Sequence, residues 1–329
     1  MKKFLNSPDA ILEESLDGFV AAHADIVVAG DERKFIRRAK LKPGKVGVVS
    51  GGGSGHEPLH AGFVGLGMLD AACPGHVFTS PTPDQIVAAV EAVDQGAGVV
   101  LIVKNYEGDV MNFEMAAELT DGRCATVLTD DDVAVEKSTY SIGRRGVAGT
   151  LIVEKMVGAA AEAGMPRDEL KSLGEAVNGR TRSMGVALTS CTTPAAGKPN
   201  FEPGENEMEM GVGIHGEPGR RRMALGSARS IAEEMLGAIL GDLGLKRGGE
   251  VILFVNGFGA TPAIELYLLY REAARIVEAA GLKPARSLVG SYVTSLDMAG
   301  ASITVSLLEG EATKLWDAPV HAAALRWGV

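Results

Sequence analysis

The chain has 329 residues, of which 46% are hydrophobic and 22% charged, with a formal charge of −10 and an isoelectric point near 5.2. This acidic balance argues against nucleic acid and anionic membrane surfaces as partners. The length suffices for two domains, each with its own core. The three cysteines lack C-x-x-C spacing, which predicts free thiols in a reducing cytoplasm and neither disulfides nor a zinc site: Cys73, Cys124 and Cys191.

The amino-terminal stretch MKKFLNSPDAILEESLDGF begins with basic residues but has no apolar segment before its acidic ones. We therefore expect no secretory signal. The longest apolar runs, such as Val99–Val103 and Val251–Val255, have the length of strands and cannot span a bilayer. These features predict a cytoplasmic protein without a membrane segment.

Strands and helices alternate through the first half of the chain, after an amino-terminal helical stretch. The stretch PDQIVAAVEAVDQ opens with Pro83 and Asp84, a favourable helix start, and carries apolar residues at helical spacing. Strands separated by helices of about ten residues predict βαβ units and a largely parallel sheet. The predicted elements are, in order, strand Val46–Val49, helix Pro83–Gln95, strand Gly98–Lys104, helix Asn112–Thr120, strand Cys124–Thr129 and two helices, Gly149–Ala163 and Arg167–Thr181.

A second alternating region begins with a strand predicted over residues 184–192. The stretch that follows it, TTPAAGKPNFEPGENEMEMG, is rich in proline, glycine and charge, so we place a boundary nearby, with domains at 1–183 and 184–329. The predicted fold class is α/β, with two α/β domains whose largely parallel or mixed sheets are flanked by helices. The later elements are helix Ser227–Leu240, strand Val251–Val255, helix Pro262–Ala280 and strands Lys283–Tyr292 and Ser302–Leu308.

The segment VGVVSGGGSGHEP, residues 46–58, carries the first functional signal. Its β-branched run ends abruptly in a cluster of glycines, Gly51, Gly52, Gly53 and Gly55. Such a loop lets backbone N–H groups approach an oxygen-rich ligand, which His56 could reach as a general acid or base. No lysine follows the glycines as the Walker A pattern requires, and His56 with Pro58 does not fit the dinucleotide pattern. The alternative is a tight turn whose glycines merely permit strained dihedrals.

Three polar residues follow predicted strands, at the end where parallel α/β sheets bind their ligands. Lys104 ends one strand, Asp109 enters the next helix, and Ser80 occupies a comparable strand-to-helix position. Each has a simpler explanation, because Asp109 suits a helix N-cap, Lys104 a solvated charge and Ser80 a turn. Together, with one of them beside the glycine loop, they predict a site for an oxygen-rich ligand.

A second histidine stands out in GVGIHGEPG, residues 211–219. His215 lies between Gly213 and Gly216, with Pro218 shortly after, so a turn would hold it. A neutral imidazole held in this way can act as a nucleophile or a base, and the alternative is an exposed loop histidine. Three further histidines are expected to be structural, namely His23, His60 and His76.

No metal site is expected on this chain. The cysteines and histidines show no metal-ligand spacing. The acidic stretch Thr129–Asp132 contains oxygen ligands that Mg²⁺ accepts, but a solvated loop is the simpler interpretation.

Several motifs together resemble the substrate-binding K subunit of dihydroxyacetone kinase. They are SGGGSGHEPLHAGFVGLGMLDAA, GHVFTSPTPDQI, LIVKNYEGDVMNFEMA, YSIGRRGVAGT and CTTPAAGKPNFE…GVGIHGEPG, and the similarity runs from about residue 7 to the carboxyl terminus. The resemblance implies a two-domain α/β subunit, usually a homodimer, that binds dihydroxyacetone. It also implies that His215 bonds covalently to the ketone carbon as a hemiaminal.

The resemblance assigns further residues one by one. Those that match the substrate-binding positions of the family are Gly53, Ser54, Gly55, His56, Ser80, Lys104 and Asp109. His56 and Asp109 match its acid–base residues, with Asp109 preferred as the base and His56 able to share or take that role. A covalent bond to the carbonyl would separate a ketone from glycerol, which an ordinary pocket discriminates by only ~1–3 kcal/mol.

The resemblance also bears on the phosphoryl donor. Single-chain relatives carry a second, helical nucleotide domain, whereas this sequence ends at Val329 without a Walker A motif or a kinase-type loop. We therefore expect no nucleotide on this chain and an L-type partner subunit that holds ADP or ATP with Mg²⁺. In phosphotransferase-linked systems, the partner keeps its ADP bound, and an M-type phosphocarrier phosphorylates that ADP again after each turnover. A partner that exchanges ATP is the alternative.

A regulatory paralogue is the alternative function. Such a protein would bind a triose and modulate a transcription factor, and it would be expected to lose the nucleophilic histidine. The presence of His56, Asp109 and His215 favours the enzyme. The choice between dihydroxyacetone and a related ketose such as erythrulose stays open.

Overall fold

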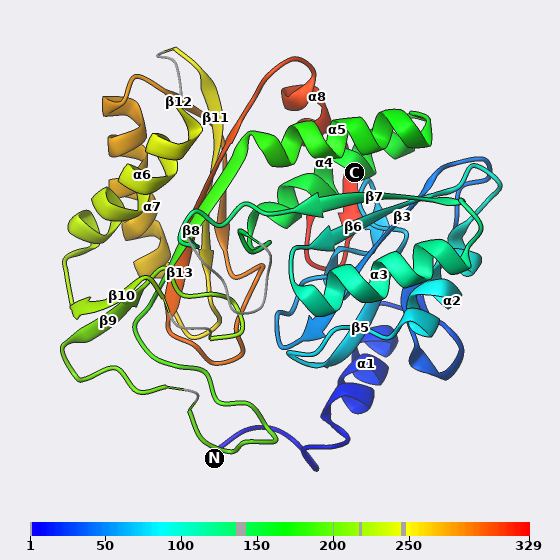
Figure 1. Ribbon diagram of the computed structural model, residues 1–329, viewed down its shortest axis with the longest axis horizontal. Helices are drawn as coiled ribbons and strands as arrows, with labels where there is room; N and C mark the ends of the chain where they lie inside the picture. Colours follow the sequence, from blue (N-terminus) through cyan, green and yellow to red (C-terminus); the bar gives the residue numbers. More distant parts are fainter. Residues whose placement is uncertain (1, 136–142, 200, 217–218, 245–247) are drawn as a thin grey trace. The chain divides into compact units, whose positions relative to one another are not determined.

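Two six-stranded sheets with their own helices organise the chain in the computed structural model (Figure 1). The structure describes residues 2–135, 143–199, 201–216, 219–244 and 248–329. The first unit comprises residues 1–129, 153–176 and 314–329, and the second comprises 130–152 and 177–313. Each unit thus combines separate stretches of chain, whereas the prediction placed a single domain boundary between residues 183 and 184. The predicted α/β fold class with mixed sheets is confirmed.

The sheet of the first unit has the strand order β1-β2-β5-β3-β6-β7. Its four strands from β5 to β7 pair in parallel, as predicted, while β1 and β2 add an antiparallel edge. The strands are β1 (Val27–Ala29), β2 (Ile36–Arg38), β3 (Gly47–Ser54), β5 (Ala71–Val77), β6 (Val99–Lys104) and β7 (Cys124–Thr129). The helices wholly within this unit are α1 (Ile11–Ala22), α2 (Pro83–Val93) and α3 (Glu107–Leu119), with the short helices η1 (Asp31–Arg33) and η2 (Ala61–Phe63).

Burial explains why the central strands form. The β6 run VVLIVK is buried at every position, as expected of a parallel strand covered on both faces. Apolar residues of α2 and α3, such as Ile86 and Phe113, pack in one cluster with β3, β5 and β6. Helix α3 begins at Glu107 with Tyr106 as its N-cap, five residues before the predicted start at Asn112.

The glycine segment is not a loop, and this part of the prediction is wrong. Strand β3 runs through the glycines to Ser54, and they pair in register with β5. The glycines are required because neighbouring atoms occupy the space of a side chain. A Cβ on Gly51 would lie 2.7 Å from the carbonyl oxygen of Cys73, and one on Gly53 would lie 2.6 Å from the amide nitrogen of Thr79. Gly55, with φ +103°, turns the chain after the strand.

A small sheet completes the first unit, with the order β15-β14-β4. Its strands were not predicted because they are only two or three residues long and show no alternation that a sequence pattern could reveal. They are β4 (Gly65–Leu66), β14 (Val320–Ala322) and β15 (Arg326–Trp327). Three helices contribute residues to both units, α4 (Gly149–Glu162), α5 (Arg167–Gly179) and α8 (Ala312–Asp317).

The second unit contains a sheet of order β10-β9-β8-β13-β11-β12, antiparallel except for the β11–β12 pair. Helices α6 (Ala228–Leu243) and α7 (Ala263–Ala279) pack their apolar residues on it. Strands β9 and β10 lack an apolar run and were missed, and β10, with its two arginines, is the edge strand, where charged residues are common. The strands are β8 (Thr181–Ala187), β9 (Glu207–Met210), β10 (Arg221–Ala224), β11 (Glu250–Gly257), β12 (Lys283–Gly290) and β13 (Gly300–Leu307).

The predicted helices and strands of this unit largely match the structure. Ser227 caps α6, and its hydroxyl accepts a hydrogen bond from the amide of Ser230 at 3.2 Å. The strand predicted over residues 184–192 ends at Ala187 and begins earlier, at Thr181. Among the described residues, no helix is long and apolar enough to cross a bilayer.

Candidate functional site

The first unit brings Lys104 and Asp109 together at the carboxyl end of β6. Lys104 is its last residue, and Asp109 lies in the first turn of α3. The ammonium Nζ is 3.4 Å from Asp109 Oδ2, and the two side chains are almost completely buried. The simpler explanations are therefore wrong, because Lys104 is not solvated and Asp109 is not the N-cap.

Ser80 lies close to this pair, and His56 is buried in the same unit. A Cβ on Gly108 would be 2.8 Å from Ser80 Oγ, so the hydroxyl lies against the first turn of α3, next to Asp109. His56 is fully buried, and its ring stacks on Phe78 with centroids 5.1 Å apart. The segment between β5 and α2 thus places the Ser80 hydroxyl next to Asp109.

The residues after the glycines already use their donors within the chain. Ser54 Oγ donates to the carbonyl oxygen of Gly75 at 2.7 Å. The Gly55 amide donates to the Glu57 carboxylate at 2.9 Å. Ser54 and Gly55 therefore shape the end of β3, and their contact with a substrate stays a prediction, as does that of Gly53.

Three buried groups behind Lys104 were not predicted as part of the site. His60 Nε2 lies 3.0 Å from Lys104 Nζ, and His60 Nδ1 lies 2.6 Å from Glu154 Oε1 and 3.1 Å from Ser50 Oγ. Burial raises the pKa of Glu154 to about 8, although the charge of Lys104 opposes the shift. Burial also holds the pKa of His60 well below its usual range. The sequence carries no signal for Glu154, which follows His60 by 94 positions.

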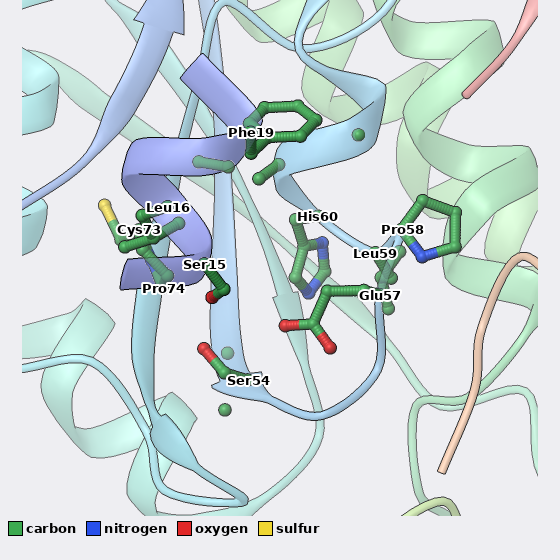
Figure 2. Close-up of a pocket in the computed structure, with 15 residues that line it drawn as sticks. Ser15, Leu16, Phe19, Ser54, Glu57, Pro58, Leu59, His60, Cys73 and Pro74 are labelled. Carbon is green, nitrogen blue, oxygen red and sulfur yellow. The ribbon is translucent and has the colours of Figure 1, made fainter. Parts of the chain in front are cut away.

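A cavity of about 380 Å³ lies beside β3 in the first unit (Figure 2). Its lining includes the predicted residues Gly53 and Ser54, together with α1 and the segment from Glu57 to Gly62. Figure 2 shows the side-chain oxygens of Ser15, Ser54 and Glu57 pointing into the same space. Burial raises the pKa of Glu57. The cavity has the size and mixed lining that suit a small molecule.

His215 belongs to the second unit. It lies in the predicted turn, in which the amide of Gly216 donates to the carbonyl oxygen of Gly213 at 3.2 Å. Its side chain is half-buried, so it is not an exposed loop histidine. Pro218, which entered the prediction of this turn, lies outside the described residues, as do residues 140–142 of the YSIGRRGVAGT motif and Asn200 of CTTPAAGKPNFE.

The acidic stretch Thr129–Asp132 is not a solvated loop, contrary to expectation. Asp131 accepts hydrogen bonds from the amides of Val147 and Gly149, at 2.9 and 2.7 Å, and Asp132 pairs with Arg145 at 2.6 Å. Burial raises the pKa of Asp131 to about 6. These carboxylates hold the second unit together, and within the described ranges no three potential ligands cluster as a metal site.

The fold and the site define a two-unit α/β protein with a buried lysine–carboxylate pair beside a glycine-rich strand. The Dak1 domain family matches residues 17–324, and the chain belongs to that family. The resemblance inferred from the motifs is thus confirmed.

Named relatives are similar over nearly the whole chain. The PTS-dependent dihydroxyacetone kinase 1, dihydroxyacetone-binding subunit DhaK, of Listeria innocua is 52% identical, covering 94% of this chain and 95% of its own. The PEP-dependent dihydroxyacetone kinase, dihydroxyacetone-binding subunit DhaK, of Escherichia coli is 46% identical over the full length of both. A solved structure, the dihydroxyacetone kinase operon co-activator Dha-DhaQ, aligns with a TM-score of 0.89 at 33% identity, covering 95% of this chain and 97% of that chain.

Proposed function

We propose that this chain is the dihydroxyacetone-binding subunit of a dihydroxyacetone kinase. The observation that carries the proposal is the buried pair of Lys104 and Asp109, with the Ser80 hydroxyl against the first turn of α3, in a chain 52% identical to such a subunit. Hydrogen-bond donors and a carboxylate at one point suit a small polyhydroxylated ketone. Its terminal hydroxyl becomes phosphorylated, giving dihydroxyacetone phosphate.

The ketone is held covalently on His215 in this proposal. One imidazole nitrogen bonds the carbonyl carbon, the C=O π bond breaks, and the imidazole N–H proton passes to the former carbonyl oxygen. The product is a hemiaminal with a new hydroxyl. Glycerol has no carbonyl and cannot form this bond, so the covalent step excludes a close analogue that hydrogen bonds would distinguish only weakly.

Asp109 acts as the base. Its Oδ1 has no hydrogen-bond partner among the described residues, so it can accept a proton from the terminal hydroxyl. The hydroxyl oxygen then bonds to phosphorus of a phosphoryl group carried by the partner subunit, and the bond from phosphorus to its leaving group breaks. His56 is the second candidate for the base, and Lys104 stabilises the negative charge that develops on oxygen.

The phosphoryl group comes from a nucleotide-binding L-type subunit, with ADP or ATP and Mg²⁺ on that partner and an M-type phosphocarrier behind it. The relatives' names, which specify PTS or PEP dependence, support this donor. We infer that the chain works in the cytoplasm as a homodimer. Mixing the purified chain with a candidate L-type subunit, with and without ATP, tests the donor. If turnover needs only that subunit and ATP, the partner exchanges its nucleotide and no phosphocarrier is required.

The regulatory alternative has one observation in its favour, the likeness to a co-activator structure. The co-activator is 33% identical to this chain, whereas the kinase subunit of Listeria innocua is 52% identical to it. The chain also keeps His56, Asp109 and His215. These two facts support the enzyme.

The covalent step is tested with dihydroxyacetone labelled with ¹³C at its carbonyl carbon. On the wild type, the protein-bound carbon should move from the ketone region of the NMR spectrum to that of a tetrahedral carbon. His215→Ala should lose this signal, while His76→Ala, at an exposed histidine of β5, should keep it. A wild type without the signal, or a His215→Ala variant that retains it, would contradict the proposal.

A further inference from the structure

A buried chain of polar groups runs behind Lys104, and the proposed function gives it no role. It consists of His60 before η2, Glu154 on α4 and Ser50 on β3. Glu154 and Lys104 are completely buried, and His60 is 6% exposed. Burial of so many titratable groups costs free energy unless each is compensated by a partner. Their alignment on a proposed substrate-binding residue therefore calls for a functional explanation.

One serine sets the hydrogen-bond directions in this chain. Ser50 Oγ donates its proton to the carbonyl oxygen of Ile102 at 2.7 Å, so it accepts from His60 Nδ1, 3.1 Å away. Nδ1 therefore carries the imidazole proton and also donates to Glu154 Oε1 at 2.6 Å. The other ring nitrogen, Nε2, bears the lone pair and accepts from Lys104 Nζ at 3.0 Å. His60 is thus a neutral imidazole that connects a carboxyl group to the ammonium.

The ammonium of Lys104 lies among three partners. It donates to His60 Nε2 at 3.0 Å and to the carbonyl oxygen of Gly51 at 3.1 Å, and it forms an ion pair with Asp109 Oδ2 at 3.4 Å. These contacts together determine where the ammonium lies. Gly52 leaves the necessary room, since a Cβ there would be 2.2 Å from Nζ.

We propose that His60 and Glu154 are positioning residues for Lys104. The inference rests on the proposed function, in which Asp109 takes up the proton of the substrate hydroxyl. Protonation removes the negative charge of Asp109, and the carboxylate of Glu154 then becomes the counter-charge that holds the ammonium, acting through His60. Two further titratable groups lie near this set, namely His56, whose electrostatic influence reaches His60, and Glu57, which lines the same cavity as His60.

The variant Glu154→Gln tests the role because it keeps the acceptor oxygen and removes the charge. With the partner subunit and its phosphoryl donor present, and at a pH above the Glu154 pKa of about 8, we expect kcat/KM to fall about tenfold to a hundredfold, mainly through kcat, since Lys104 loses its position in the reacting complex. The matched control is Glu162→Gln on the same helix, which removes an ion pair with Arg38. That control should lower the thermal unfolding midpoint and leave kcat/KM unchanged.

A pH profile provides a readout that a merely structural role would not move. Since burial raises the pKa of Glu154 to about 8, kcat/KM of the wild type should rise as the pH passes through this value. The Glu154→Gln variant should lack that limb. A folded Glu154→Gln enzyme with wild-type kcat/KM and an unchanged profile would overturn the proposal.

A measurement without turnover separates this inference from the proposed function. ¹⁵N NMR of the imidazoles, with His60 assigned through His60→Gln, should show the Nδ1–H tautomer and a shift of that proton in Glu154→Gln. The Nε2–H tautomer would overturn the hydrogen-bond directions and the proposal with them. An inactive wild type with the expected tautomer would refute the proposed function, and with it the positioning role, whereas an active wild type indifferent to Glu154→Gln would refute the positioning role alone.

Discussion

Two buried clusters of charged side chains lie along strand β3, and they differ in how their carboxylate oxygens are paired. At the amino end of the strand, Asp70 accepts from Lys45, from the Val48 amide at 2.8 Å and from Arg38 at 3.1 Å, while Glu162 of α4 also pairs with Arg38. Further along the strand, the second cluster contains Lys104, Asp109, His60 and Glu154. Helix α4 supplies one glutamate to each cluster.

The difference lies in the carboxylate oxygens. Both oxygens of Asp70 have partners, which suits a cluster that only anchors the strand. In the second cluster, Asp109 Oδ1 and Glu154 Oε2 have no hydrogen-bond partner among the described residues, although both are buried. An unsatisfied buried oxygen costs free energy, and such a cost is typical of atoms that must accept a proton or a ligand.

The largest functional difference between the two clusters is expected at Asp109. Asp109→Asn should lower kcat by about 10² to 10⁴, the usual contribution of a general base, because an amide cannot accept the hydroxyl proton. The free energy of unfolding should fall as well, because the buried Lys104 ammonium loses an ionic partner, so kcat is compared on fully folded protein. Steady-state kinetics with the partner subunit check the prediction, and a kcat within a few-fold of wild type would transfer the role of base to His56.

Asp70→Asn is the opposite case. It leaves Lys45 and Arg38 with an incomplete partner in a buried site, and we expect the free energy of unfolding to fall by about 3 to 5 kcal/mol. Activity per folded molecule should stay at the wild-type level. Urea unfolding and kinetics on the same preparation test both statements. A catalytic defect in fully folded Asp70→Asn would show that the first cluster also serves catalysis.

Two glycine substitutions on β3 should have different effects on activity and stability. In Gly52→Ala the new Cβ meets the end of the Lys104 side chain and lies 3.4 Å from His60 Nε2, so the ammonium must shift and kcat/KM should fall about tenfold to a hundredfold in folded protein. In Gly53→Ala it meets the backbone of Phe78 and Thr79, which cannot move away cheaply, so stability should fall instead. Thermal unfolding and kinetics of the pair give the result, and equal defects in both would show that β3 simply tolerates no side chain.

The smallest expected effect is the pH dependence of stability due to Glu154. Burial raises its pKa from 4.5 to about 8, so the folded state binds the proton more tightly, and stability is lost as the pH rises toward 8. His60, whose pKa is lowered from 6.5, reduces the stability of the folded state only as the pH falls below 6.5. Between pH 6.5 and 8, wild type should therefore lose about 1 to 2 kcal/mol relative to Glu154→Gln, at ~1.4 kcal/mol per pH unit. If urea unfolding shows the same change in stability with pH for wild type and Glu154→Gln across this range, the raised pKa of Glu154 is contradicted.

Local patterns predicted the elements whose signal lies within one stretch of chain. Strand β7 has the predicted bounds, and α2, α4 and β6 end within two residues of theirs. Strand β5 was missed because Pro74, Gly75 and His76 interrupt its apolar pattern, while pairing with β3 supplies the missing stability. The run of glycines in β3 was mistaken for a loop for the same reason.

Sequence motifs were enough to recognise the family, the alternation of strands and helices, and four chemical candidates, Lys104, Asp109, His56 and His215. That the glycines form a buried strand and that Lys104 lies among acceptors became evident only from the packed fold. The physical reason is distance along the chain. Glu154 meets His60 across 94 positions, and such a contact depends on how helices and strands pack, which no local pattern encodes.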